Sequence, residues 1–353
     1  MADQHGVAVL WLLLMLTCGL LQQAQVLVSG FEPETQPGKA ARRVCYYQAG
    51  TVHRPGEASY KIEDIPGVLC SHIIYAFADL SNVTWEVMPS NPSFDIDAGG
   101  YERFVGLKDT YPDLTATIGV GGGGSGTAEV FSQMASRKEQ RDVFVQSIVD
   151  LVKRYNFDGV DVDWEYPDTP EDKENFRLLM DELRAALDAE AQSLELTMAV
   201  PIVRYRLHDG YSVPELCRAV DAVHLMGYDL RGVWNDVADV HSMLYRRPDI
   251  DFGILEEINL ICTNLKNDPE WKREWDNEGL VPYTYKGDQW IGYEDPESLK
   301  IKMDYIRKMG YLGAMNWAID DDDFKGWCGL GVNPMMTAIY EGLKNYTVPR
   351  SKE

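Results

Sequence analysis

From Arg43 onward, short runs of β-branched and aromatic residues alternate with longer stretches of helical periodicity. That order is typical of parallel strands joined by crossover helices. It predicts an α/β fold, a TIM-type (β/α)8 barrel, although only seven of the eight strands of a complete barrel are recognisable. The strands are expected at residues 43–48, 71–77, 114–120, 159–164, 194–200, 222–226 and 313–319.

Two helices are predicted beside the fourth strand. Thr169 and Pro170 supply an N-cap and a first-turn proline for the second of them. Between Gly232 and Lys300 the alternation lapses, apart from a hairpin expected at residues 280–285 and 289–293. The apolar faces of the helices are Phe144, Ile148, Leu151, Val152 and Tyr155 in the first, and Phe176, Leu179, Met180, Leu183 and Leu187 in the second.

The charge and composition of the chain limit the classes of molecule that it can bind. The 353 residues are 45% hydrophobic, enough for a full core, and carry a formal net charge of −23. Repulsion therefore opposes binding to nucleic acid or to an anionic membrane surface. We find no linker and no second domain, and expect a monomer.

The first residues predict secretion. The apolar run from Val7 to Leu21 is short for a membrane span, so residues 1–29 are interpreted as a signal peptide. A retained anchor is the alternative, because the segment before the run has His5 but no Lys or Arg. With the signal removed, the product is extracellular and has no membrane contact.

Five cysteines then remain, enough for two disulfides and one odd thiol in an oxidising compartment. No C-x-x-C spacing occurs, so a zinc site is not expected, and no metal or cofactor is predicted. Asn82 and Asn345 lie in N-x-T sequons and are candidate glycosylation sites.

The stretch from Phe157 to Pro167 contains the candidate catalytic residues. On a strand with period-two alternation, Asp161, Asp163 and Glu165 point to one face. Like charges held together raise a carboxyl pKa, and a carboxylic acid kept neutral can act as a general acid. Glu165 comes last, where strands of such barrels end in the active site, so it is the predicted proton donor. A solvated acidic face and a divalent metal site are the alternatives.

The run Asp158-x-x-Asp161-x-Asp163-x-Glu165, followed by Tyr166-Pro167, resembles the signature of family 18 glycoside hydrolases, the chitinases and chitinase-like proteins. The resemblance extends over nearly the whole chain. It includes His72-Ile73-Ile74-Tyr75-Ala76-Phe77, Met226-Gly227-Tyr228-Asp229 and Gly313-Ala314-Met315-Asn316-Trp317.

The resemblance implies a retaining, substrate-assisted hydrolysis of β-1,4-linked N-acetylglucosamine polymers. Glu165 would protonate the glycosidic oxygen while the acetamido oxygen of the sugar attacks the anomeric carbon. Asp163 would orient the acetamide and share a proton with Asp161, and Tyr228 would hydrogen-bond the acetamido group. The implied substrate-binding residues are Tyr46, Phe77, Gly122, Gly123, Met226, Asp229, Trp234, Met315 and Trp317. The implied disulfides are Cys45–Cys70 and Cys262–Cys328, which leave Cys217 as the odd thiol.

Taken without the resemblance, Trp317 could equally be a core aromatic. The run Asp320–Asp323 could suggest calcium, but it fits a strand-end loop and helix start better.

The sequence also departs from the pattern. Gly50 and Gly123 stand where active relatives usually have sugar-stacking tryptophans. The catalytic domain, residues 41–345, lacks the seventh strand and most of an α+β insertion around residues 248–294. Such a barrel would expose two strand edges, and a splice form or an error in the gene model would explain the gap equally well. The polar tail, residues 346–353, is expected to be frayed.

Two other functions compete. A non-enzymatic lectin or growth factor could bind chitin in the same cleft, although such proteins usually lose the acid at the position of Glu165. Gly119–Gly124 also fits the G-x-G-x-x-G pattern of dinucleotide-binding enzymes. That pattern needs a ribose-binding acid about 20 residues on, and the next strand begins only near Gly159.

Overall fold

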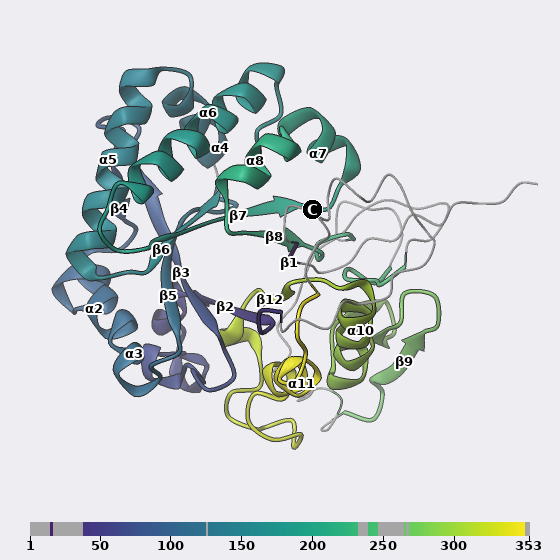
Figure 1. Ribbon diagram of the computed structural model, residues 1–353. Helices are drawn as coiled ribbons and strands as arrows, with labels where there is room; N and C mark the ends of the chain where they lie inside the picture. The colour runs from purple at the N-terminus through teal and green to yellow at the C-terminus, as the bar shows by residue number, and fades with distance from the viewer. Residues whose placement is uncertain are drawn as a thin grey trace, which may run out of the picture.

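A computed structural model describes residues 15–16, 38–124, 126–231, 239–245, 265 and 268–349. Seven of its strands form a parallel sheet that curls into a nearly closed barrel, with helices on the outside (Figure 1). In sheet order the strands are β2 (Arg42–Gln48), β3 (His72–Leu80), β5 (Thr115–Gly121), β6 (Gly159–Asp163), β7 (Glu195–Pro201), β8 (Ala222–Met226) and β12 (Gly313–Asn316).

The predicted barrel is therefore confirmed. β12 is shorter than expected, because the strand ends at Asn316 and Ile319 already begins the 3-10 helix η5 (Ile319–Asp321). The outer helices are α2 (Gly100–Val105), α3 (Leu107–Thr110), α4 (Thr127–Ala135), α5 (Lys138–Tyr155), α6 (Pro170–Asp188), α7 (Arg204–Gly210), α8 (Val213–Ala219), α10 (Pro296–Met309) and α11 (Pro334–Leu343).

The gap in the barrel lies between β8 and β12. A two-residue strand, β1 (Met15–Leu16), lies between them and pairs antiparallel with both. The two edges, which the sequence predicted to be open, are thus partly paired in the structure. Residues 15 and 16 belong to the predicted signal peptide, so its removal would leave both edges without this partner.

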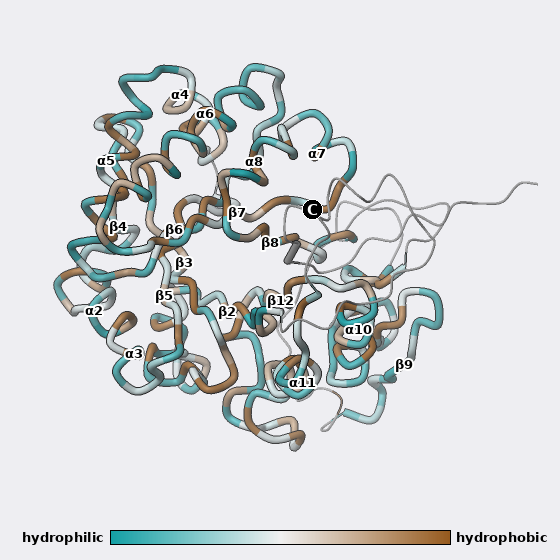
Figure 2. Tube along the Cα trace, viewed as in Figure 1, coloured by the Kyte–Doolittle hydropathy of each residue, from teal (hydrophilic) through white to brown (hydrophobic). Residues whose placement is uncertain are grey.

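The helices beside β6 form where the sequence predicts them. α5 ends at Tyr155, and the next residue, Asn156, caps the helix in a left-handed conformation with φ 59°. α6 begins after Thr169, whose Oγ1 accepts a hydrogen bond from the Asp172 N–H over 3.0 Å. Apolar residues gather along the strands, whereas hydrophilic residues dominate the outward sides of the helices (Figure 2).

A second, smaller sheet consists of β9 (Lys272–Asp276), β10 (Val281–Lys286) and β11 (Gln289–Gly292). The β10–β11 hairpin was predicted, whereas β9 was not, because its residues alternate poorly between apolar and polar. These strands lie within residues 248–294, where the sequence predicts a shortened insertion; residues 248–264 lie outside the described residues.

The prediction of a frayed tail is wrong for residues 346–349. Thr347 forms an antiparallel bridge with Ala40, and the Val348 N–H donates to the Lys39 carbonyl over 2.9 Å. Val348 is buried in the main core, so this segment is held against residues 39–41.

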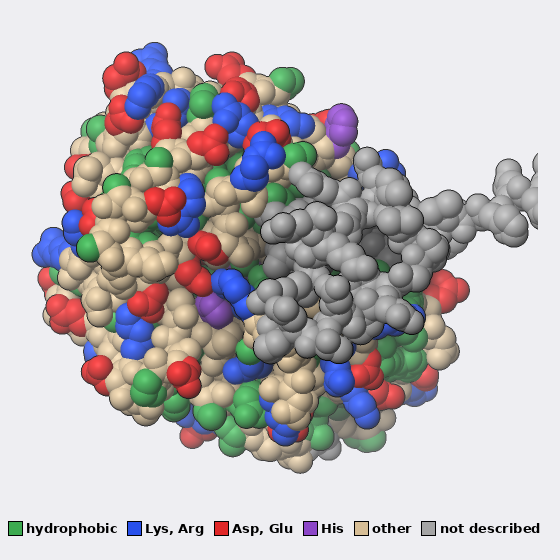
Figure 3. Space-filling model, viewed as in Figure 1, with side chains coloured by type: hydrophobic (Ala, Val, Ile, Leu, Met, Phe, Trp, Pro, Cys, Tyr) green, Lys and Arg blue, Asp and Glu red, His purple; other side chains and the backbone are tan. Residues whose placement is uncertain are grey.

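On the face shown in Figure 3, basic and acidic side chains are interspersed over the described surface without a large area of one sign. No helix among the described residues is long and apolar enough to cross a membrane.

Candidate active site

The carboxylates predicted at the end of β6 lie inside the barrel. Asp161 and Asp163 are buried, and Glu165 follows the strand's last residue and is partly buried. Trp164 points the opposite way and stacks on Phe131 of α4 with ring centroids 5.6 Å apart. The alternation therefore divides the segment into an acidic inner face and an apolar outer face, as predicted.

Asp161 is held by contacts from three other strands, β2, β7 and β8. Its oxygens accept from the Tyr46 hydroxyl and from Thr197 Oγ1, each over 2.6 Å, and His224 Nδ1 lies 3.2 Å away. Burial alone would raise the pKa of Asp161, but His224 and these hydrogen bonds lower it below its ordinary value. Asp161 is therefore the member of the series that stays ionised.

The Tyr46 hydroxyl also lies 2.7 Å from His224 Nδ1. Because Tyr46 gives its only proton to Asp161, the His224 Nδ1 must carry the proton for that second contact. All three donors around Asp161 thus come from the protein, which disfavours a divalent cation as their common partner.

Asp163 differs from Asp161 in that its surroundings raise its pKa instead of lowering it. Burial, together with the charges of Glu165 and Asp161, raises its pKa well above the ordinary value. Its Oδ1 is buried and has no hydrogen-bond partner among the described residues. Asp163 is therefore a neutral acid with one oxygen available to a ligand.

Glu165 is the outermost of the three. Burial raises its pKa, as does the charge of Asp229, while a hydrogen bond from Tyr166 and the charge of Arg206 act in the other direction. Its carboxyl group faces Gly123, where an added Cβ would lie 3.3 Å from Oε1. The glycine leaves open space beside the acid.

The end of β8 closes another side of the site. Tyr228 is partly buried, and burial with the nearby charges of Asp163 and Glu165 raises the pKa of its phenol well above the ordinary value. It is therefore a neutral hydroxyl that can donate a hydrogen bond. Met226 at the end of β8 is buried, and Asp229 has the left-handed φ of 55°.

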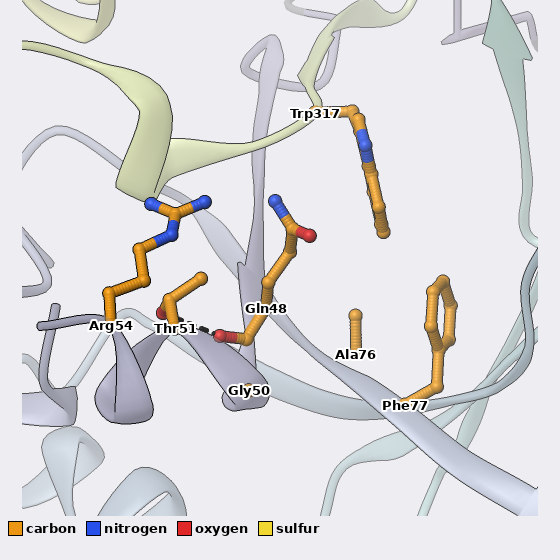
Figure 4. Close-up of a pocket in the computed structure, with 7 residues that line it drawn as sticks. All are labelled: Gln48, Gly50, Thr51, Arg54, Ala76, Phe77 and Trp317. Carbon is orange, nitrogen blue, oxygen red and sulfur yellow. Dashed lines mark hydrogen bonds between the residues drawn. The ribbon is translucent and has the colours of Figure 1, made fainter. Parts of the chain in front are cut away.

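Aromatic rings form a wall next to the carboxylates. Trp317 stacks on Phe77 with centroids 5.4 Å apart and planes at 22°, and it meets Tyr46 edge-on at 5.4 Å. Trp317 is only partly buried, unlike Met315 on the preceding strand. An open pocket of about 380 Å³ lies against this wall, lined by Gln48, Gly50, Thr51, Arg54, Ala76, Phe77 and Trp317 (Figure 4).

The glycine-rich turn after β5 packs against this site. The Gly122 N–H donates to the Asp163 carbonyl over 2.8 Å. Gly121 has φ 116°, and a Cβ there would lie 2.1 Å from the same carbonyl. Only glycine allows this approach, so the glycines serve the contact between β5 and β6.

Comparison with known proteins agrees with this arrangement. The model of the family described as glycosyl hydrolases family 18 matches residues 42–263 and 251–322. The chain belongs to that family. An endochitinase of Manduca sexta is 37% identical over 399 aligned positions, which cover 92% of this chain and 72% of that protein.

Solved structures of the family are also similar. A mutant of Ostrinia furnacalis Group II chitinase catalytic domain 2, in complex with penta-N-acetylchitooctaose (NAG)5, has a TM-score of 0.81 at 26% identity. That match covers 88% of this chain and 98% of the other. Human YKL-39, described as a pseudo-chitinase with retained chitooligosaccharide binding properties, has a TM-score of 0.73 at 25% identity, covering 87% and 100%.

Membership of family 18 overturns the dinucleotide-binding alternative and confirms the recognised family. The shortening of the chain is also consistent with the comparison. The alignment with the Manduca sexta protein spans 399 positions, more than the 353 residues of the whole chain. That relative therefore has residues within the matched region that this chain lacks.

The cysteines differ in part from expectation. Cys45 and Cys70 form a disulfide. Cys328 is disulfide-bonded, and its implied partner Cys262 lies outside the described residues. Cys217 is disulfide-bonded too, so its prediction as an odd thiol is wrong. The pairing of Cys217 could not be predicted, because spacing in the sequence does not determine connectivity.

Several expected features lie at the margin of the site. Trp234 lies outside the described residues. Asn82 and Asn345 are exposed, as glycan acceptors must be. Asp322 accepts hydrogen bonds from the Met335 and Met336 N–H groups at the start of α11, so part of the acidic run serves a helix start as predicted.

Four residues at the site were missed by the sequence analysis: Thr197, His224, Tyr166 and Arg206. The first two carried a signal, because each is polar at an inward-facing position of an otherwise apolar strand. Nothing in the local sequence indicates that Arg206 lies over the Tyr166 ring beside Glu165, because that contact joins α7 to the segment after β6.

Proposed function

We propose that this family 18 protein is a secreted chitinase that hydrolyses β-1,4-linked N-acetylglucosamine polymers with retention of configuration. One observation supports this above the others. Within five residues, the fold keeps Asp161 ionised while it raises the pKa of Asp163 and of Glu165. Opposite protonation of neighbouring carboxyl groups is the property that acid catalysis at near-neutral pH requires.

In the proposed reaction, Glu165 donates its proton to the glycosidic oxygen as the bond to the anomeric carbon breaks. The acetamido oxygen of the same sugar attacks that carbon and forms an oxazolinium ion, so the protein supplies no nucleophile. Glu165 then takes a proton from the water that opens the ring, which regenerates the acid and returns the original configuration.

Asp163 is placed to assist the acetamide. Its unpartnered Oδ1 can accept the acetamide N–H, and its proton can pass toward Asp161 as positive charge develops on the sugar. The phenol of Tyr228 can donate to the acetamido oxygen. Each group would bind the intermediate more tightly than the substrate, which is what lowers the barrier.

The aromatic wall suits the sugar ring. Trp317 and Phe77 line an open pocket (Figure 4), and the Tyr46 ring meets Trp317 edge-on. Apolar faces of pyranose rings stack on such side chains. Met226, Asp229 and Met315 would shape the same subsite, with Gly122 and Gly123 beside it.

We further infer secretion from the predicted signal at residues 1–29, with Asn82 and Asn345 as exposed glycan acceptors. The proposed enzyme acts as a monomer on chitin or its oligomers, without cofactor, metal or nucleic acid.

A second candidate function is chitin binding without cleavage. Two observations favour it: the chain is shorter within its matched region than the Manduca sexta relative, and the similar YKL-39 is described as a pseudo-chitinase. A small displacement of the acid would be enough to abolish hydrolysis, since misplacement by about 1 Å can cost a hundredfold in rate.

The test compares the mature chain with its Glu165→Gln variant on a fluorogenic N-acetylglucosamine oligomer, with oligomer binding followed by calorimetry. Hydrolysis by the wild type and its loss in Glu165→Gln, with binding retained, is expected. A folded wild type that binds oligomers and never cleaves them would favour the binding function instead.

A further inference from the structure

Arg206 lies beside the general acid without touching it. Its guanidinium sits over the ring of Tyr166, 4.5 Å from the centroid, and Tyr166 directly follows Glu165. The side chain of Arg206 is partly buried. It has no salt bridge in the part of the chain that the structure describes. A half-buried cation that faces a ring instead of a carboxylate needs another explanation than surface pairing.

The helix that carries Arg206 is fixed to the active-site segment. Gly210, the last residue of α7, packs so closely on the Pro167 carbonyl that an added Cβ would lie 2.0 Å from its oxygen. From the other side, Lys173 Nζ of α6 donates to the His208 carbonyl over 2.5 Å. These contacts hold α7 against the chain that runs from Glu165 to Pro167, so the Arg206–Tyr166 contact is built into the fold.

The charges around Glu165 are otherwise acidic. Burial and the charge of Asp229 after β8 oppose a negative charge on Glu165, and among the described residues Arg206 is the positive group that favours it. In the part of the chain that the structure describes, the other titratable groups that act on this cluster include the hydroxyls of Tyr166, Tyr211 and Tyr228.

We propose that Arg206, acting through Tyr166, is a positioning residue that stabilises the Glu165 carboxylate left behind when the acid gives up its proton. The inference rests on the proposed function, in which Glu165 is the acid. Tyr166 donates a hydrogen bond to Glu165, and a cation over its ring makes the phenol a stronger donor. The arrangement lets Glu165 be a neutral acid before the transfer and a tolerated anion after it.

The direction of the effect follows from the charges. Loss of the Arg206 charge raises the pKa of Glu165, because the carboxylate loses a favourable neighbour. The matched pair of variants is Arg206→Gln and Arg204→Gln. Both remove one positive charge from α7, but Arg204 is exposed and has no contact with Tyr166. The difference between the Glu165 pKa values of the two variants therefore reports the effect of the position of the charge, because both variants lose the same charge.

The experiment titrates Glu165 by ¹³C NMR of protein labelled at the glutamate side-chain carboxyl, with the resonance assigned through Glu165→Gln. Arg206→Gln should raise the titration midpoint by about 0.5 pH unit or more, and Arg204→Gln should leave it unchanged. Tyr166→Phe should raise it as well. Arg206→Gln should add less in the Tyr166→Phe background than alone, because the cation acts through the phenol.

If Arg206→Gln and Arg204→Gln shift the titration midpoint of Glu165 from its wild-type value by the same amount, the inference is overturned. Arg206→Lys guards against a folding defect, since it keeps the charge and should titrate like the wild type. A midpoint for Arg206→Lys equal to that of Arg206→Gln would contradict an electrostatic role.

Activity supplies the second readout. The alkaline limb of the kcat–pH profile on the fluorogenic oligomer should move with the NMR midpoint, with KM little changed. If the wild type does not hydrolyse the oligomer, the proposed function fails, and the titration still decides the role of Arg206.

Discussion

The Tyr46 hydroxyl donates a hydrogen bond to Asp161 over 2.6 Å, from the first parallel strand of the barrel to the strand of the acidic series. Both residues are almost completely buried. This bond, which no pattern in the sequence indicates, helps to set which of the three carboxyl groups carries the negative charge.

Tyr46→Phe should therefore reduce kcat by roughly tenfold to a hundredfold, because hydrogen bonds to charged groups contribute roughly 1.5–3 kcal/mol. Without this donor the pKa of Asp161 rises, so Asp161 is less able to remain the ionised partner of Asp163. The control is Tyr47→Phe, since the Tyr47 hydroxyl is buried with no partner among the described residues. Steady-state kinetics on the oligomer compares the two, and equal effects would show that Tyr46 has no special role.

The Asp229 charge should determine part of the alkaline limit of activity. It raises the pKa of Glu165, and an acid must be protonated to act, so activity is lost as pH rises through that pKa. Asp229→Asn is expected to move the alkaline limb of the kcat profile to lower pH. A limb that stays in place, or moves to higher pH, would mean that the limb belongs to another group.

Much of the fold could be predicted from the sequence. The β6 segment shows why: its alternation of acidic and apolar residues decides both which side faces the barrel and which packs on α4 and α6. Thr169-Pro170 likewise identifies the start of α6, because capping is a local property.

What could not be predicted depends on contacts between distant segments. His224 and Thr197 contact Asp161 from separate strands, and Arg206 contacts Tyr166 from helix α7. The order of the chain up to Pro349 could not be predicted for the same reason. Its backbone groups gain partners only when the distant segment Lys39–Ala41 lies beside them.

Stability at low pH should depend on Glu195 at the start of β7. Burial opposes its charge, but His72 and Arg42 lower its pKa to about 2 from an ordinary 4.5. Because the folded pKa is depressed, the stabilisation is present above about pH 4.5 and is lost as pH falls toward 2; it is on the order of 3 kcal/mol.

Glu195→Gln should thus be less stable than the wild type at pH 7 and differ little from it near pH 2, as measured by urea unfolding. The control is Glu190→Gln, which breaks a surface pair with Lys153 and is expected to cost less than about 1 kcal/mol. A wild-type advantage over Glu195→Gln that persists unchanged to pH 2 would refute this account.

Gly50→Trp should strengthen oligomer binding. Gly50 lines the pocket, and a Cβ there meets nothing within 4 Å, so a ring can extend the aromatic wall. A fall in KM of roughly threefold to tenfold is expected for longer oligomers. Gly123→Trp is the contrasting variant: its Cβ would lie 3.3 Å from Glu165, so kcat should fall. Equal behaviour of the two would mean that the open space at Gly50 does not receive sugar.

The most direct test of the central claim, that Glu165 and the substrate's own acetamide perform the hydrolysis, is the anomeric configuration of the first product. It can be followed by ¹H NMR in the first minutes after mixing enzyme with a chitin hexamer. The account predicts that the β-anomer appears first and then mutarotates. Initial release of the α-anomer would contradict it, since direct attack by water inverts the configuration.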